Sequence, residues 1–431
     1  MADVFLKGGT VIDERGLISQ NRGILLKKGR IHSIGIDEKE IKSDTEVFDC
    51  SSLFITPGIP NLHTHSPMNI FKGIAEDVDE QSWFNEEIWP YESKMEPGDV
   101  YAGSSLAIAE MINRGVTAFA DHYFHADQVC RAAIDGGIRL DMAPTLFGMA
   151  GRFDEQLEAS TELMDSLSET SDLLAFHYGP HAPYTCSPDE LAGTAEAAEK
   201  TGRGIHIHVA DAKAQIEASR EKYGRTPFQI LKDSGVLDQP LIVGHGLWIL
   251  EEEIPLIGKD TYFAVCPKTY MKLSAGTGRL WQFADRLPLA IGTDGAASSN
   301  SLDPLEQLKF FLLLGKLTMG DSTKFTLEEG WTILMKGHKA MPFRSGRIKE
   351  GYSADLIFWD LDRINTAPVY NPLASIIYSS GPENIVHSMV GGRFVKKNGE
   401  VQMDLKAIRR EAGDRAKAIL QRGKGRTKLI F

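Results

Sequence analysis

The sequence predicts a (β/α)₈ barrel of the TIM type, accompanied by a small β-sandwich domain. In the middle of the chain, short β-rich runs alternate with stretches of helical spacing, whereas both ends contain short alternating strands with turn residues. Strands that alternate with helices form a parallel sheet, and eight such units close into a barrel. An open, doubly wound sheet is the alternative, but no glycine-rich dinucleotide fingerprint follows any strand. The eight expected strands begin near Gly58, Val116, Arg139, Leu173, Gly204, Pro240, Thr261 and Pro288.

Helical spacing separates most of these strands. One expected helix runs from Asp99 to Arg114, and Gly115 follows it as a helix stop. Apolar residues three and four positions apart lie on one face of a helix. The residues expected to share that face are Ala107, Ile108, Met111 and Ile112.

The two ends of the chain are predicted to form one β domain. Residues 1–56 and 346–402 each contain too few strands for an independent sandwich, so we expect them to pair with each other. The barrel then covers residues 57–345. Residues 403–431 are predicted to form a C-terminal helix and tail, with a surface helix from about Leu405 to Gln421.

The composition excludes several classes of protein. The chain has 431 residues, of which 42% are hydrophobic and 25% charged, so it can bury a large core and is not disordered. A net charge of −12 argues against nucleic acid, which requires clustered Lys and Arg. We expect no signal peptide and no membrane span. Scattered cysteines favour reduced thiols and a cytoplasmic location, at Cys50, Cys130, Cys186 and Cys266. A small-molecule substrate is the expected partner, and symmetry considerations make a homo-oligomer a reasonable assembly.

Metal-ligand residue types gather at the ends of the predicted strands. His63 and His65 end the first strand, two residues apart and therefore on the same side of it. In a barrel, the carboxyl ends of all the strands form the active-site face, so residues from distant strands meet there. Imidazoles with one carboxylate suit Zn²⁺, with Fe²⁺ or Mn²⁺ as alternatives. The predicted ligands are His63, His65, His208 on strand five, His245 on strand six and Asp294 on strand eight.

A single His-x-His pair is weak evidence, and the chain contains two, at His63/His65 and His206/His208. The stronger signal is that all five predicted ligands fall at the same ends of strands. His206 points the same way as His208 but one layer deeper, so we expect it to pack behind the ligands. Three histidines outside these motifs are expected to be ordinary core or surface residues, namely His32, His338 and His387.

Four segments carry a resemblance to a known family: NLHTHSPM at 61–68, GPHAPYTC at 179–186, HIHVA at 206–210 and GTDGAASSNSLD at 292–303. From about residue 5 to residue 400 the chain resembles the amidohydrolase superfamily. It is most similar to the branch of methylthioadenosine/S-adenosylhomocysteine deaminases and triazine hydrolases. The resemblance implies a barrel with one zinc ion and a flanking β-sandwich. It also implies that Glu92 and His181 contact substrate and that His245 polarises the attacking oxygen. Without the resemblance, Glu92 reads as a solvated carboxylate and His181 as a loop-packing residue.

The ligand set predicts hydrolysis. Zinc lowers the pKa of a bound water towards neutrality. Asp294 beside that water can accept its proton and later deliver it to a leaving amine. Attack at an amine-bearing ring carbon would release ammonia.

The pocket wall departs from the family pattern. The deaminases carry Glu three residues after the strand-five histidine, where this chain has Asp211. Asp is one methylene shorter, and a misplacement of about an ångström can cost roughly a hundredfold in rate. After strand seven, relatives have His-Asn/Cys-Pro-x-Ser-Asn, but here the segment reads VCPKTYMKL and introduces Lys268 and Tyr270. Trp248 stands where a histidine is common. We predict that Lys268 and Tyr270 contact substrate.

The connection from Ser66 to Pro97 is unusually long and carries four aromatic residues between positions 83 and 91. Such connections are often lids or binding loops, and an aromatic lid would stack on a planar heterocycle. Equally, these rings can simply pack on the barrel rim. On the first interpretation Trp89 contacts substrate; the other three rings are Trp83, Phe84 and Tyr91.

Three functions remain open at this point. The favoured one is a zinc aminohydrolase of a planar N-heterocycle, with a 5′-modified adenosine such as methylthioadenosine or S-adenosylhomocysteine as the first substrate class. Asp211 motivates the second, a hydrolase with another leaving group such as chloride, an alkylamine or an amide. The third is a catalytically silent relative that only binds a metal or a ligand, although a complete ligand set argues for water activation.

Overall fold

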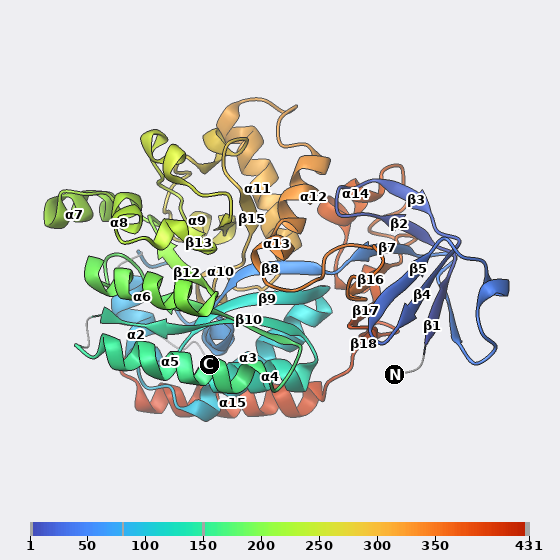
Figure 1. Cartoon of the computed structure of the whole chain (residues 1–431), viewed down its shortest axis with the longest axis horizontal. Coiled ribbons are helices and arrows are strands. Elements are labelled where there is room, and N and C mark those ends of the chain that lie inside the picture. Colours follow the sequence, from blue (N-terminus) through green and yellow to red (C-terminus); the bar gives the residue numbers. More distant parts are fainter. Residues whose placement is uncertain (1–2, 80–81, 149–150, 427–431) are drawn as a thin grey trace.

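The computed structural model describes residues 3–79, 82–148 and 151–426. The predicted tail beyond residue 426, the first two residues of the β domain and residues 80–81 of the long connection lie outside the described residues. Figure 1 shows a barrel with helices around it on one side, and N-terminal and C-terminal strands side by side on the other.

The predicted barrel is confirmed. Neighbouring strands pair in parallel in chain order, from β8 to β15. The amides of Thr293 and Asp294, just beyond β15, donate to the carbonyl of His63 in β8, at 3.0 and 2.9 Å. These bonds join the last strand to the first, which excludes the open sheet. Within the described ranges the strands are β8 (Ile59–Thr64), β9 (Val116–Tyr123), β10 (Arg139–Leu146), β11 (Leu174–Pro180), β12 (Gly204–Val209), β13 (Leu241–His245), β14 (Thr261–Val265) and β15 (Leu289–Ile291).

Helices follow most strands and cover the barrel. The expected helix 99–114 is α3 (Pro97–Asn113), and its four predicted core residues are all buried. Gly115 follows the helix with φ of +80°, the left-handed conformation expected of a helix stop. The other helices around the barrel are α4 (Ala126–Gly136), α5 (Phe153–Ser168), α6 (Pro188–Thr201), α7 (Lys213–Tyr223), α8 (Pro227–Asp233), α9 (Pro267–Lys272), α10 (Ala296–Ser299), α11 (Pro304–Met319), α12 (Leu327–Met335) and α13 (Gly337–Ala340).

Strands from both ends of the chain form two further sheets. One is N-terminal, in the order β5 (Arg30–Ile34), β4 (Gly23–Lys27), β1 (Val4–Lys7), β6 (Glu46–Asp49). The other has the order β19 (Glu400–Val401), β18 (Arg393–Lys397), β17 (Ile385–Val390), β16 (Leu356–Trp359), β7 (Phe54–Pro57), β2 (Thr10–Ile12), β3 (Ile18–Gln20). The two ends meet where β7 pairs antiparallel with β16. A separate apolar core, including Leu26, Ile55 and Phe358, is shared by both ends.

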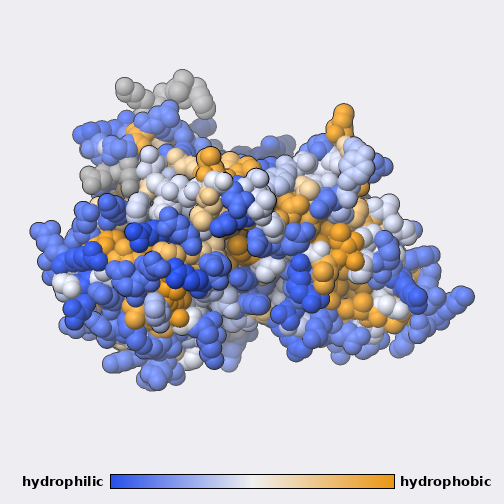
Figure 2. All heavy atoms as spheres, turned by 90° about the horizontal axis from the view of Figure 1, so that it is seen from above, coloured by the Kyte–Doolittle hydropathy of each residue, from blue (hydrophilic) through white to orange (hydrophobic). Residues whose placement is uncertain are grey.

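The C-terminal helix α15 (Leu405–Arg422) crosses the outside of α3, as Figure 1 shows along the lower edge of the barrel. Arg422 forms an ion pair with the buried carboxylate of Asp99 at the start of α3, and a second with Glu96 at 2.6 Å. None of the helices in the described ranges combines the length and apolar character needed to cross a lipid bilayer. The face drawn in Figure 2 is mostly hydrophilic, with apolar residues in small separate patches.

Lys396 in β18 gives a pH-dependent contribution to stability. Its side chain is buried, and its ammonium donates to the carbonyls of Asn113 and Pro382 at 3.0 and 2.8 Å. Burial, together with the smaller effect of the nearby Arg114 charge, lowers the pKa of Lys396 to about 8. In the unfolded chain a lysine titrates near its ordinary value, about 10.4.

Between these two pKa values the unfolded chain binds more protons, so raising the pH stabilises the folded form. The penalty for burying the charge is complete below pH 8 and is relieved as the pH rises towards 10.5. We therefore expect the unfolding free energy of the parent, relative to Lys396→Met, to rise by about 2 kcal/mol between pH 7 and pH 10. Urea denaturation of both proteins at the two pH values measures it, and a pH-independent difference would contradict the assigned pKa.

Candidate active site

Three of the predicted ligands form one group at the carboxyl end of the barrel. His63 lies in β8, His65 directly follows it and His208 lies in β12, and their candidate ligand nitrogens are all within 4.8 Å of one another. Asp294 adjoins the group, with its Oδ1 3.5 Å from His65 Nε2. Four of the five predicted ligands therefore come together from three different strands.

The hydrogen bonds of His65 and His208 orient both rings for a cation. His65 Nδ1 lies 2.7 Å from the carbonyl of His122, and His208 Nδ1 lies 2.8 Å from the carbonyl of His181. A carbonyl oxygen can only accept, so each Nδ1 carries a proton and each Nε2 of a neutral ring presents a lone pair. These two Nε2 atoms face each other at 3.1 Å. Two lone pairs at this distance repel unless a positive charge lies beside them, so the arrangement fits a bound metal ion.

His63 completes the group. Its Nδ1 lies 2.8 Å from His206 Nε2, so His206 stands behind His63 and orients it. His63 Nε2 is buried and has no hydrogen-bond partner among the described residues. Desolvation, together with the neighbouring imidazoles, lowers the pKa of His63 and of His208 well below the ordinary value. Both rings are therefore neutral at physiological pH, which is the form that binds a metal.

Backbone geometry brings the ligand-bearing strand ends together. His245 and Asp294 both have positive φ, +73° and +61°, a conformation that non-glycine residues adopt at a cost and mostly at functional sites. Two glycines allow the strands to approach His63. A Cβ at position 244 would lie 3.1 Å from His63 Cε1, and one at position 292 would lie 2.8 Å from His63 Cβ.

His245 lies beside the group rather than within it. Its ring centroid is 5.2 Å from that of His63 and 5.7 Å from that of His208, on which it stacks. Its Nδ1 lies 3.3 Å from the hydroxyl of Tyr270. The structure thus places His245 next to the site, but does not bring it into the three-histidine group as the predicted fifth ligand.

Glu92 and His181, which the resemblance assigns to substrate, both lie at this end of the barrel. Glu92 is buried in α2 (Trp89–Glu92) and accepts a hydrogen bond from Tyr123 at 2.7 Å. Burial raises the pKa of Glu92, while Tyr123 and His65 act in the opposite direction. The His181 ring lies 5.0 Å from His208 and its Nδ1 contacts Thr185, and burial lowers the pKa of His181 to about 3.

The aromatic residues of the long connection divide into two kinds. Tyr91 is buried and packs in the core, whereas Phe84 and Trp89 are 38% and 40% exposed and stack on each other. Phe147 continues the row, 6.4 Å from Trp89 and 4.8 Å from His181. Part of the segment therefore packs on the rim, and part leaves rings exposed beside the site.

The C-terminal end of the chain supports this connection. Arg426 forms an ion pair at 2.6 Å with Glu86, which lies in the π-helix η3 (Trp83–Ile88). Gly423 and Gly425 approach the ring of Tyr91 so closely that a Cβ at either position would clash with it. The segment that carries Trp89 and Glu92 is thus held against the end of α15.

Lys268 and Tyr270, both in α9, occupy different surroundings. The Lys268 ammonium pairs with Glu306 at 2.8 Å and with the Ser301 hydroxyl at 3.1 Å, on the side of α11. The hydroxyl of Tyr270 contacts His245 and the backbone amide of Cys266. The polar groups of both residues already have protein partners. Substrate contact by either residue therefore stays a prediction.

Two polar atoms at the ends of β12 and β13 are buried without a partner among the described residues, Asp211 Oδ1 and Trp248 Nε1. The backbone of Trp248 donates to the carbonyl of Ala210 at 3.0 Å, so these two strand ends are adjacent. A buried carboxylate oxygen and a buried indole N–H without partners are available to a bound molecule.

His122 and its neighbours also lie at the site, although they were not among the predicted residues. The ring of His122, near the end of β9, lies 4.9 Å from His208, and its carbonyl orients His65. Asp121 accepts hydrogen bonds from Thr64 and from the amide of Ser66, on either side of His65. Asp121 and His122 also lie at a strand end, where polar residues are expected to be functional. The same criterion therefore predicts them as site residues.

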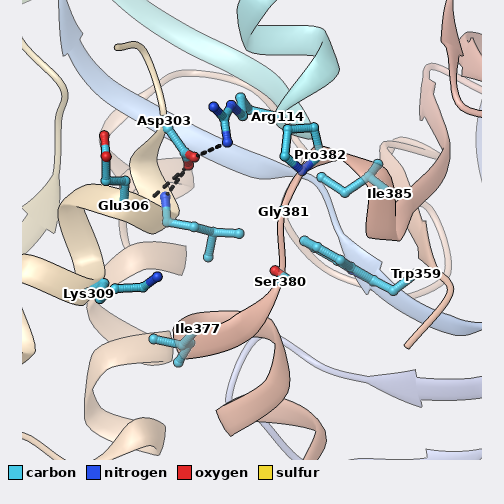
Figure 3. A pocket seen from close by; sticks show the side chains of 11 residues that line it. Arg114, Asp303, Glu306, Lys309, Trp359, Ile377, Ser380, Gly381, Pro382 and Ile385 are labelled. Carbon is cyan, nitrogen blue, oxygen red and sulfur yellow. Dashed lines mark hydrogen bonds and ion pairs between the residues drawn. The ribbon is translucent and has the colours of Figure 1, made fainter. Parts of the chain in front are cut away.

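A separate cavity of about 130 Å³ lies between the barrel and the β domain. Figure 3 shows Arg114 and Asp303 at one side of it, with Pro382 beside Arg114, and these two charged side chains form an ion pair at 2.9 Å. It is lined by none of the predicted site residues.

A parallel barrel with a histidine group of metal-binding type at its carboxyl end defines the class of metal-dependent barrel hydrolases. The family model of the amidohydrolases matches residues 54–395, and the chain belongs to this family of metal-dependent hydrolases acting on carbon–nitrogen bonds.

Individual relatives agree with this assignment. The chain is 34% identical to a 5-methylthioadenosine/S-adenosylhomocysteine deaminase of Pyrococcus horikoshii, over 92% of this chain and 96% of that protein. The crystal structure of an adenosine deaminase from Xanthomonas campestris with bound zinc has a TM-score of 0.90 and 26% identity, and covers 97% of this chain and 99% of that one. A triazine hydrolase of Arthrobacter aurescens shares the fold, with a TM-score of 0.88 and 19% identity over 96% of this chain and 100% of the other.

Proposed function

We propose that this protein is a zinc-dependent deaminase that releases ammonia from the amine-bearing ring carbon of a 5′-modified adenosine. One observation carries the proposal most directly: the two Nε2 lone pairs of His65 and His208 face each other at 3.1 Å beside the carboxylate of Asp294. The deaminases among the relatives support the choice of reaction and of substrate class.

His63, His65, His208 and Asp294 would hold the ion. Neutral imidazoles with one carboxylate suit zinc, and Fe²⁺ and Mn²⁺ remain alternatives. When bound, the ion supplies Lewis-acid activation of a water molecule. The backbone carbonyls of His122 and His181, which fix the rings of His65 and His208, would hold these ligands ready.

The side chains around the ion divide the proton transfers. Asp294 would accept the proton of the attacking water and deliver it to the leaving amine. Asp211, whose buried Oδ1 has no partner in the described part of the chain, would protonate the ring nitrogen. His245, which the sequence suggests both as a ligand and as a polarising group, is assigned the second role, because its Nδ1 is occupied by Tyr270.

The rest of the site would bind the nucleoside. Glu92, held by Tyr123, offers a carboxylate to the ribose hydroxyls. The row formed by Trp89, Phe147 and His181 offers aromatic faces on which a planar base can stack. A 5′ substituent would then extend towards the long connection.

A panel of amines tests this function. Zinc-loaded protein is incubated with 5′-methylthioadenosine, S-adenosylhomocysteine, adenosine, guanine and aminotriazines, and ammonia release is measured alongside the metal content. We expect the fastest release from a 5′-modified adenosine. No release from any compound by protein that contains one equivalent of metal would defeat the proposal and favour a ligand-binding role.

The shorter carboxylate at Asp211 favours one second candidate, hydrolysis with chloride, an alkylamine or an amide as leaving group. If the native reaction is deamination with Asp211 in place, Asp211→Glu should lower ammonia release from 5′-methylthioadenosine about tenfold to a hundredfold, because the carboxylate is displaced by about an ångström. Steady-state kinetics measure it, with Asp233→Glu on the exposed end of α8 as the matched control. A gain in deamination would instead favour the second candidate.

A further inference from the structure

Tyr270 occupies an unusual place in the site. It lies in α9, is 3% exposed, and directs its hydroxyl towards the junction of β13 and β14. The backbone amide of Cys266 donates to this hydroxyl oxygen at 3.0 Å, and His245 Nδ1 lies 3.3 Å from the same oxygen. No other hydrogen bond of the Tyr270 hydroxyl is found within the described ranges.

The number of available protons decides which group donates in the hydrogen bond between the Tyr270 hydroxyl and His245 Nδ1. An amide N–H can only donate, so the Tyr270 oxygen is the acceptor towards Cys266, and its own proton is free for His245. If His245 Nδ1 carried a proton instead, the hydroxyl would accept twice and its buried O–H would have no acceptor. A buried donor without a partner is costly, so the fully paired arrangement is the one in which Tyr270 donates to Nδ1.

The phenol of Tyr270 is suited to donate a hydrogen bond to His245. A tyrosine has an ordinary pKa of about 10, and burial raises the pKa of Tyr270 well above that value. The hydroxyl therefore keeps its proton at physiological pH. Its oxygen also accepts from the backbone amide of Cys266 at the start of α9, so the hydroxyl proton is left for His245.

We propose that Tyr270 is a positioning residue that fixes His245 as the tautomer with its proton on Nε2. In a neutral imidazole one nitrogen donates and the other accepts, so a hydrogen bond received at Nδ1 places the proton on Nε2. This Nε2 belongs to a ring that packs against His63 and stacks on His208. His245 thus presents an N–H to the reacting oxygen, where negative charge develops in the transition state.

This assignment rests on the proposed function and replaces a direct substrate contact by Tyr270. A hydroxyl that already accepts from one protein group and donates to another has little capacity left for a ligand. It also accounts for the direction of the Tyr270 side chain after β14, whose hydroxyl contacts Nδ1 of His245.

Tyr270→Phe tests the inference kinetically. We expect kcat for 5′-methylthioadenosine to fall about tenfold to a hundredfold, with KM changed less than about threefold and the zinc content unchanged. Tyr178→Phe is the matched control, because Tyr178 is also fully buried and its hydroxyl contacts Thr161 instead of His245. A rise in KM with kcat preserved would make Tyr270 a substrate contact and overturn the inference, as would an unchanged kcat.

A second measurement does not depend on turnover. Long-range ¹H–¹⁵N correlation spectra of the zinc-loaded, full-length protein distinguish protonated from unprotonated ring nitrogens, and comparison with His245→Gln identifies the ring of His245. We expect a proton on Nε2 in the parent, and loss of this preference in Tyr270→Phe. A proton on Nδ1 in the parent overturns the inference. Because the spectrum needs no substrate, it decides this point even if the amine panel shows no activity.

Discussion

Asp294→Asn is expected to lower kcat/KM for 5′-methylthioadenosine about a thousandfold or more. The carboxylate is the only acidic group beside the three-histidine group for which both a ligand role and a proton-transfer role are proposed. Its Oδ1 lies 3.5 Å from His65 Nε2. An amide binds a cation more weakly and cannot accept the water proton, and loss of general acid–base catalysis alone costs about 10² to 10⁴ in rate.

The substitution keeps the local structure intact. Asp294 Oδ1 accepts from the amide of Gly295 at 2.6 Å, and the amide oxygen of asparagine can accept the same bond. Asparagine also tolerates the positive φ found at this position. We therefore expect a folded variant with a loss of activity and a weaker hold on zinc.

Steady-state kinetics together with elemental analysis of the purified variant measure both effects. Asp303→Asn is the control. It is another buried aspartate, caps α11 and pairs with Arg114, but it lies in the separate cavity of Figure 3. It should cost stability while leaving kcat/KM within a few-fold of the parent. Activity of Asp294→Asn within tenfold of the parent would contradict both roles assigned to Asp294.

The barrel could be predicted because its pattern is local. Each parallel strand is a short apolar run, and the expected starts at Val116, Arg139, Gly204 and Thr261 coincide with those in the structure. The residues at the strand ends then converge by topology alone, which is why His63, His65 and His208 could be placed together from the sequence.

Side-chain direction could not be predicted in the same way. Lys268 and Tyr270 are two residues apart in one short helix, yet Lys268 pairs with Glu306 and Tyr270 reaches His245. The direction of each side chain depends on the packing of α9 against α11 and the barrel. Residue spacing alone does not predict that packing. The sequence pattern also cannot show that His245 adopts positive φ and that its Nδ1 contacts the Tyr270 hydroxyl.

The pairing of the two chain ends was predictable only in outline. Strand count indicated that residues 1–56 and 346–402 must combine, but the exact domain boundaries stay a prediction. The mixed sheet joins the two ends of the chain through the long-range pairing of β7 with β16. Nothing local specifies that register, because short strands of similar composition are compatible with several pairings.

A buried ion pair between the barrel and this β domain should make a large contribution to the free energy of unfolding. Arg139, the first residue of β10, binds both carboxylate oxygens of Asp355, at 2.7 and 3.2 Å, and also contacts Ser353 and the carbonyl of Asp172. Arg139 is 8% exposed and Asp355 is fully buried. Removing one partner leaves a buried charge uncompensated, which typically costs about 3–5 kcal/mol.

Arg139→Met is therefore expected to lower the free energy of unfolding by about 3–5 kcal/mol, measured by urea denaturation. The double variant Arg139→Met, Asp355→Leu removes both charges and should be less destabilised than the single one, which separates the cost of the unpaired charge from lost packing. The exposed pair of Arg225 and Asp233 serves as the control, and Arg225→Met should cost less than about 1 kcal/mol. If the single and double variants were equally destabilised, Asp355 would carry no unpaired charge after the loss of Arg139. The junction would then depend on shape rather than on charge.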